Sequence, residues 1–189
     1  TISEYDENLS KDLSVEDILV HSSNIGSVKI GQIIGQEKLQ TFLKKIGILS
    51  QLDFDMEETG KPLPFKWRDC KLETISYGHG VTTTPIQLAK GYAILANGGY
   101  DVKPTLIKKK IYNSQKKRIL NKDVSNKMNR MLIKVVTQGT ATLSDVEGYE
   151  VGGKTGTAQI VENGAYTNKK INTFASIFPS SNPKYVLII

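Results

Sequence analysis

The chain has 189 residues, 39% of them hydrophobic, and a formal net charge of +6, which indicate one water-soluble globular domain with room for a sizeable core. A single cysteine excludes an internal disulfide or a cysteine metal cluster, and two histidines are too few for most zinc sites. From these counts we expect no bound metal. The excess charge comes from scattered lysines with few aromatic residues between them, so we expect no nucleic-acid partner.

Both ends of the chain are abrupt. Thr1 is not an initiator methionine, and the longest apolar run, residues 185–189, ends the chain inside a strand-like pattern. The sequence contains no signal peptide and no apolar run long enough to span a membrane. We therefore expect residues 1–189 to be a single-domain fragment of a larger protein.

The first part of the chain carries helical patterns. The sequence S-V-E-D at residues 14–17 is a capping box and predicts a short helix directly after it. Apolar residues at helical spacing predict helix over residues 25–46, with a break at Gly35 and a stop at Gly47. Residues 52–66 are rich in Asp, Glu, Gly and Pro, which predicts a loop.

The middle of the chain alternates turns and helices. Residues 76–80 are rich in glycine and predict a turn, after which Pro85 opens a helix that a glycine pair ends. Residues 104–120 predict a hairpin that turns near Asn113. Residues 123–136 predict a helix with one apolar stripe, formed by Val124, Met128, Met131, Leu132 and Val135.

The last part of the chain carries strand patterns. Residues 151–161 and 171–178 are rich in β-branched residues and flank the turn sequence Asn163-Gly164, which predicts a hairpin, and residues 184–189 predict a third strand. Helices followed by antiparallel strands predict an α+β (mixed) fold in one domain.

The sequence K-T-G-T at residues 154–157 has two incompatible interpretations. Residues 148–155 satisfy the phosphate-loop pattern G-x-x-x-x-G-K-[ST], but such a loop must open a helix, and Gly156 and the β-branched residues after it favour a strand. Nucleotide binding is therefore only a remote alternative. The other interpretation is the edge-strand motif of enzymes that acylate a serine with a peptide or a β-lactam, which pair K-[ST]-G with S-x-N and S-x-x-K.

Further motifs carry a resemblance to one family. Ser22-Ser23-Asn24-Ile25-Gly26 followed by K-T-G-T resembles the second and third motifs of the penicillin-binding transpeptidases. The segments G-H-G at residues 78–80, T-P-I-Q-L-A at 84–89 and A-N-G-G at 96–99 resemble the septal, cell-division type of class B penicillin-binding protein. The motifs occur in family order across the whole chain. The resemblance implies a penicillin-binding/β-lactamase-like fold, a five-stranded antiparallel sheet flanked by helices, incomplete here at both ends.

The resemblance implies three catalytic residues. Ser22 would shuttle a proton from the nucleophile to the departing amine, and Asn24 would hold a substrate amide. Lys154 would supply positive charge to the transition state and the substrate carboxylate. Alone, the S-S-N tripeptide is more typical of a helix cap, and Lys154 of a solvated strand lysine. Their joint occurrence favours catalysis.

The next three residues of the same strand are implied in substrate binding. Thr155 would hydrogen-bond the terminal carboxylate of the substrate, and Gly156 would let a peptide approach the strand edge closely. The backbone N–H of Thr157 would be one donor of an oxyanion hole. The implied chemistry needs no metal and no organic cofactor.

The nucleophile of the family, the serine of S-x-x-K, lies upstream of S-x-N and has no counterpart before Ser22. Two matches lie elsewhere. The match at residues 114–117 falls at a predicted hairpin turn downstream of the wrong motif, and the match at 181–184 contains Pro183, which prevents the required helical turn. We therefore expect this fragment to lack the nucleophile and to be inactive alone.

The resemblance implies that the intact parent is a serine-type D,D-transpeptidase that cross-links peptidoglycan stem peptides. Its ligands would be D-Ala-D-Ala stem peptides and β-lactams, and its partners membrane proteins of the division machinery. It would lie at the periplasmic face of the inner membrane, anchored by an N-terminal span outside this chain. Two alternatives stay open, a β-lactam sensor or hydrolase of the same superfamily and a non-catalytic peptide-binding module.

Overall fold

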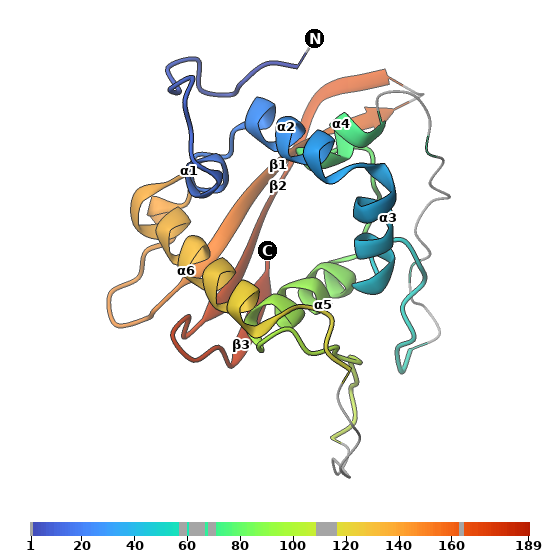
Figure 1. Ribbon diagram of the computed structural model, residues 1–189. Coiled ribbons are helices and arrows are strands. Elements are labelled where there is room, and N and C mark those ends of the chain that lie inside the picture. The colour runs from blue at the N-terminus through green and yellow to red at the C-terminus, as the bar shows by residue number, and fades with distance from the viewer. Residues whose placement is uncertain (1, 57–59, 61–66, 68–70, 109–116, 163–164) are drawn as a thin grey trace.

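The computed structural model describes residues 2–56, 60, 67, 71–108, 117–162 and 165–189 (Figure 1). These residues form helices in the first two thirds of the chain and antiparallel strands in the last third, so the predicted α+β class is confirmed. The elements are α1 (Val15–Val20), α2 (Asn24–Ile34), α3 (Gln36–Lys45), α4 (Lys71–Ser76), α5 (Pro85–Ala96), α6 (Lys122–Gln138), the 3₁₀ turn η1 (Thr142–Ser144), β1 (Gly152–Glu162), β2 (Ala165–Phe178) and β3 (Tyr185–Ile188).

The sheet has the order β1-β2-β3, and both strand pairs are antiparallel. β1 and β2 form a long hairpin whose register runs from Gly152 opposite Ile177 to the residues next to the turn, with one irregularity after Gln159. The predicted hairpin and third strand are confirmed, while the turn residues 163–164 lie outside the described residues.

The helices α5 and α6 cover the sheet. α5 packs on β2 and β3, and α6 packs on β1, as Figure 1 shows where both helices cross in front of the strands. The buried apolar side chains of α6 are Leu132, Val135 and Val136, and the buried polar residue Ser125 lies in its first turn. Val124, predicted for the same stripe, is 45% exposed because it lies in the first turn of α6, outside the buried cluster. The buried apolar stripe is therefore confined to the second half of the helix.

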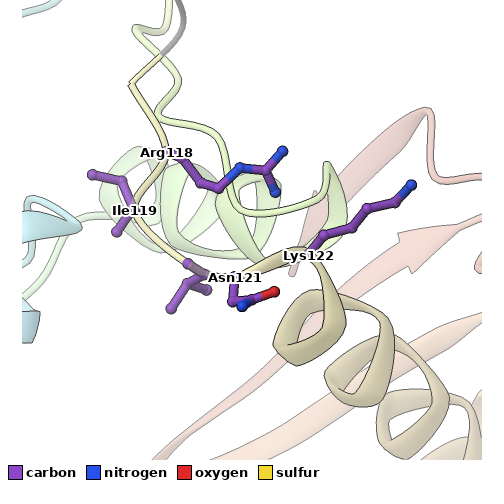
Figure 2. A pocket seen from close by; sticks show the side chains of 5 residues that line it. Arg118, Ile119, Asn121 and Lys122 are labelled. Carbon is purple, nitrogen blue, oxygen red and sulfur yellow. The ribbon is translucent and has the colours of Figure 1, made fainter.

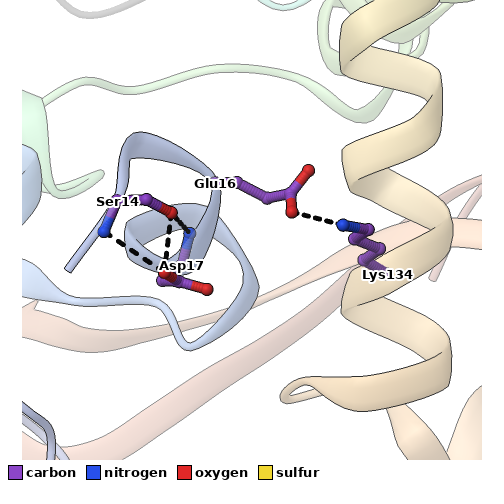
Figure 3. A network of polar contacts seen from close by, with 4 residues as sticks. All are labelled: Ser14, Glu16, Asp17 and Lys134. Carbon is purple, nitrogen blue, oxygen red and sulfur yellow. Dashed lines mark hydrogen bonds and ion pairs between the residues drawn. The ribbon is translucent and has the colours of Figure 1, made fainter.

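A polar network holds α1 in place (Figure 3). Ser14 Oγ accepts a hydrogen bond from Asp17 N at 3.1 Å, and the Asp17 carboxylate accepts one from Ser14 N at 3.2 Å, so the predicted capping box is present. The Ser14 hydroxyl also donates to Asp17 Oδ2 at 2.6 Å, and this bond, followed by the one from Ser14 N, lowers the pKa of Asp17. The neighbouring Glu16 forms an ion pair with Lys134 of α6. Because α6 lies on the sheet, this ion pair links α1 to the sheet layer.

The predicted helices are present, and one helix, α4, was missed. The break at Gly35 separates α2 from α3, and Pro85 opens α5 after the cap residue Thr84. α4 was not predicted because its six residues contain too few apolar positions to show a helical period. None of the helices in the described part of the chain has the length and hydropathy that a bilayer crossing needs.

The predicted hairpin over residues 104–120 is only partly visible. Its turn, near Asn113, lies outside the described residues, as does most of the predicted loop over residues 52–66. The pairing that is described joins Tyr100 to Arg118, before the predicted start. Residues 104–108 do not form a strand; the backbone N–H of Leu106 bonds to the Asp55 carboxylate at 3.0 Å instead.

Candidate active site

Ser22 occupies a sharp reversal between two helices. α1 ends at its cap residue His21, and α2 begins at Asn24. Ser22 has φ 59°, which is the left-handed region that residues with a side chain rarely occupy. This conformation directs the hydroxyl toward β1, where Lys154 Nζ donates a hydrogen bond to Ser22 Oγ at 2.9 Å.

Lys154 lies near the start of β1 and is partly buried. Burial lowers the pKa of the Lys154 ammonium from 10.5 to about 8. Its second hydrogen bond runs to the carbonyl of Thr155 at 3.0 Å, a neutral acceptor that does not restore the lost hydration of the charge. The group is therefore positively charged at neutral pH but close to its titration point.

Close packing of α1 against the end of α6 brings these two residues together. A Cβ on Gly139 would lie 2.3 Å from the carbonyl oxygen of Val20, so only glycine fits where the helices meet. The next residue, Thr140, donates its N–H to the same carbonyl at 3.3 Å. The hydroxyl of Thr140 lies 2.9 Å from that of Thr155 in β1.

Thr140 is a residue of this site that the sequence analysis did not identify. It follows directly after the glycine that ends α6, and that glycine can be taken for an ordinary helix stop. Thr140 could have been identified from one pattern, a glycine required by a close helix contact and followed by a residue with a hydroxyl group.

The segment after Ser22 serves as a helix cap. Ser23 is 1% exposed, and its hydroxyl accepts a hydrogen bond from Gly26 N at 2.9 Å. Ser23 is thus the N-cap of α2, while Ser22 makes the contact with Lys154. The capping interpretation of this tripeptide is correct for its second serine, and the first serine remains available for chemistry.

Asn24 lies in the first turn of α2 and is held from the N-terminal segment. Its side-chain nitrogen donates to the carbonyl of Ser3 at 2.9 Å, and its backbone N–H donates to the Glu4 carboxylate at 2.7 Å. Among the described residues, no hydrogen bond joins the Asn24 side chain to Lys154 or Ser22. The structure therefore brings Ser22, Lys154 and Thr155 into contact and places Asn24 beside them through another segment.

Gly156 and Thr157 lie further along β1, where the strand is exposed. A Cβ on Gly156 would meet no atom within 4 Å, and the Thr157 hydroxyl donates to the side-chain oxygen of Asn172 in β2 at 3.2 Å. β1 is the outer strand of the described sheet, so its other edge is open to an added peptide strand.

Two of the alternative motifs have no catalytic geometry, and the S-x-x-K match at residues 114–117 lies outside the described residues except for Lys117. K-T-G-T lies inside β1 and is not followed by a helix, so the phosphate-loop interpretation is wrong. Ser181 contacts the Glu150 carboxylate from a turn that precedes β3, so Lys184 is not on a helical turn with it. Within the described ranges, no three His, Cys, Asp or Glu side chains gather as they would around a metal ion.

A wide hollow of about 550 Å³ lies at the other end of α6, lined by residues 118–122 (Figure 2). Arg118 has a structural role there, because its guanidinium donates a hydrogen bond to the Gly98 carbonyl at 2.7 Å and lies 4.1 Å from the centre of the Tyr100 ring. The 17 residues of α6 separate this hollow from Thr140 by about 25 Å. It is therefore not part of the Ser22–Lys154 site.

Comparisons with known proteins agree with the motifs. The family model described as penicillin binding protein transpeptidase domain matches residues 1–189. A probable peptidoglycan D,D-transpeptidase PenA of Neisseria meningitidis is 31% identical over 189 residues, covering 97% of this chain. A probable peptidoglycan D,D-transpeptidase FtsI of Caulobacter vibrioides is 29% identical over 180 residues, covering 90% of this chain. Penicillin-binding protein 3 of Mycobacterium tuberculosis, crystallised with ampicillin, superposes with a TM-score of 0.90 at 25% identity over 99% of this chain.

The chain spans only part of each of these proteins. It covers 32% of the length of PenA, 30% of FtsI and 46% of the crystallised penicillin-binding protein 3.

Proposed function

Because the chain belongs to the penicillin-binding protein transpeptidase family, we propose that its parent is a peptidoglycan D,D-transpeptidase of septal cell-wall synthesis. The observation that supports this most directly is the 2.9 Å hydrogen bond between Lys154 and Ser22. It joins two motifs that lie 132 residues apart in the sequence. One motif lies at the start of a helix and the other lies in a strand, so neither needs the other to form its local structure.

The reaction would proceed through a serine acyl-enzyme. A serine outside residues 1–189 attacks the carbonyl of the penultimate D-Ala. Its hydroxyl proton passes through the Ser22 hydroxyl to the nitrogen of the terminal D-Ala, which leaves as the free amino acid. The amine of a neighbouring stem peptide then attacks the ester, which releases the serine and forms the cross-link. Ser22 passes the proton of the attacking amine to the departing serine oxygen, so both hydroxyls end in their starting state.

The remaining site residues would bind the donor peptide. The Lys154 ammonium and the Thr155 hydroxyl hold the terminal carboxylate, and Thr140 orients Thr155 through their 2.9 Å contact. The open edge of β1 takes up the peptide backbone beside Gly156, where no side chain intervenes. The N–H of Thr157 stabilises the oxyanion of the tetrahedral intermediate. Asn24 holds a substrate amide, and no metal or organic cofactor takes part.

Residues 1–189 would form one part of the transpeptidase domain of a longer protein. A β-lactam would acylate the same serine outside residues 1–189. The structure of the related penicillin-binding protein 3 in complex with ampicillin supports β-lactam binding by this family. The parent would be anchored by a span beyond this chain, with the site on the periplasmic face of the membrane and with division proteins of that membrane as partners.

The test is labelling with a fluorescent penicillin. We expect no label on a polypeptide of residues 1–189 and stoichiometric label on one extended upstream through S-x-x-K, both checked for folding by circular dichroism. A covalent adduct on any of residues 1–189, located by peptide mass spectrometry, would contradict the assignment of the nucleophile. Rapid loss of the label from the extended protein would favour a β-lactam hydrolase, and absence of label on a folded extended protein would favour a peptide-binding module.

A further inference from the structure

The carboxylate of Glu4 binds the segment that follows Ser22 at three points. Ser23 Oγ donates to Glu4 Oε1 at 2.6 Å, Asn24 N donates to Oε2 at 2.7 Å, and Ile25 N donates to Oε1 at 3.2 Å. All three donors lie about twenty positions further along the chain, and both oxygens of the carboxylate are used. Glu4 is therefore bound to the start of α2 and not merely near it.

The hydrogen bonds to Glu4 fix the geometry of the start of α2. The first backbone N–H groups of a helix have no partner within the helix, and a carboxylate placed there makes charge-assisted hydrogen bonds with them. The Ser23 hydroxyl is 1% exposed and has two roles, because it donates to Glu4 and accepts from Gly26 N at 2.9 Å. Glu4 thereby fixes the orientation of the N-cap side chain.

The residue next to this cap is Ser22, whose φ of 59° is unfavourable for a serine. A strained conformation persists only where its surroundings hold it. On one side of Ser22, His21 caps α1, and on the other side Glu4 fixes Ser23. Without the Glu4 contacts, the reversal could relax and turn the Ser22 hydroxyl away from Lys154.

The same segment sets the orientation of the Asn24 side chain. Since its nitrogen donates to the Ser3 carbonyl at 2.9 Å, its oxygen is the end that remains to accept a hydrogen bond from a substrate amide. Ser3 and Glu4 together thus act on both residues of the S-x-N motif that would touch the substrate.

We propose that Glu4 is a positioning residue for the S-x-N motif, which holds the Ser22 hydroxyl toward Lys154 and the Asn24 amide toward the substrate. This proposal rests on the proposed transpeptidase function. It differs from a purely structural role, in which the carboxylate stabilises α2 and has no effect on the reaction of correctly folded molecules.

The test uses the longer protein that contains the S-x-x-K motif, with fluorescent penicillin as the probe and stopped-flow measurement of acylation. Glu4→Gln keeps the size of the side chain but replaces one acceptor oxygen with a donor and removes the charge. Glu4→Asp keeps the charge and both acceptors on a shorter side chain. Glu7→Gln is the matched control, because Glu7 is an exposed carboxylate of the same segment.

We expect Glu4→Gln to lower the acylation rate constant about tenfold, the equivalent of one charge-assisted hydrogen bond, with the binding constant for the penicillin unchanged. The fraction of protein labelled at completion should equal that of the wild type. Glu4→Asp should recover part of the lost rate constant, and Glu7→Gln should match the wild type.

A structural role gives a different pattern, namely a reduced labelled fraction with a wild-type rate constant in the molecules that react. That pattern, or a Glu4→Gln protein that matches the wild type, would overturn the proposal. If Glu4→Gln does not fold, the rate constant of Glu4→Asp decides, because a wild-type value would overturn the proposal as well. A wild-type protein that takes up no label would refute the transpeptidase function itself, and this inference with it.

Discussion

The pKa of Lys154 gives the most direct prediction of this site, which concerns the rate of acylation at alkaline pH. Burial lowers this pKa to about 8, so the ammonium is present below that pH and is lost above it. If the positive charge is what the transition state and the substrate carboxylate need, the acylation rate constant must fall as the pH rises through 8.

The size of the effect follows from the titration. With a pKa of about 8, the protonated fraction of Lys154 is about 0.91 at pH 7 and about 0.09 at pH 9, which predicts a roughly tenfold loss of rate. A lysine with its ordinary pKa of 10.5 would still be about 97% protonated at pH 9, so its rate would hardly change. The two cases are therefore well separated within a range of two pH units.

The assay measures penicillin acylation of the longer protein from pH 6 to 10, with circular dichroism to verify folding at each pH. Lys154→Arg is the control, because a guanidinium stays charged throughout this range. Its rate constant should be lower at pH 7, since the guanidinium does not fit the Ser22 contact, but it should be independent of pH up to 9. A wild-type rate that stays flat or rises through pH 8 would refute the reasoning, and so would an alkaline decrease that persists in Lys154→Arg.

Three further substitutions test the parts that support the site. Gly139→Ala places a Cβ 2.3 Å from a carbonyl oxygen of α1 and should lower the free energy of unfolding by about 1–3 kcal/mol, as measured in urea. Gly91→Ala, at a buried position of α5 where a Cβ would meet no atom within 4 Å, should not destabilise. Thr140→Val removes the hydroxyl beside Thr155 and should weaken binding of a carboxylate-bearing penicillin by about 1 kcal/mol, without loss of stability, as seen in the concentration dependence of acylation. Ser125→Ala removes a fully buried hydroxyl that bonds two backbone groups at the end of α5, and should cost about 1–3 kcal/mol of stability with the acylation rate of folded protein unchanged.

The helices and the sheet could be predicted from local patterns because their determinants are local. The capping box before α1, Pro85 at the start of α5 and the β-branched residues of β1 each act within a few positions. The motif residues Ser22 and Lys154 could likewise be named from the sequence. The contact between them could not be derived, because it depends on the packing of α1 against α6 and not on any pattern near either residue.

The parts that the sequence did not reveal depend on long-range contacts. Thr140 becomes a site residue only because Gly139 lets α6 approach Val20 closely, and Glu4 becomes important only because the chain returns to the start of α2. The exposed Val124 illustrates the reverse, since its helical spacing suggested burial that the tertiary structure does not provide. Periodicity predicts which face of a helix is apolar but not how far along the helix the core extends.

The direction of the Lys154–Ser22 hydrogen bond strengthens the pH prediction. A lysine ammonium has three donors and no acceptor, so while Lys154 is charged, the Ser22 oxygen can only accept from it. The proton of the Ser22 hydroxyl must then point elsewhere, and the open side of the site is where a leaving amine would need it. Once Lys154 is neutral, its nitrogen can accept, and the Ser22 proton can turn toward it and away from the substrate. In the proposed mechanism, deprotonation would therefore remove the positive charge and also misdirect the shuttled proton, and we expect both effects to lower the rate above pH 8.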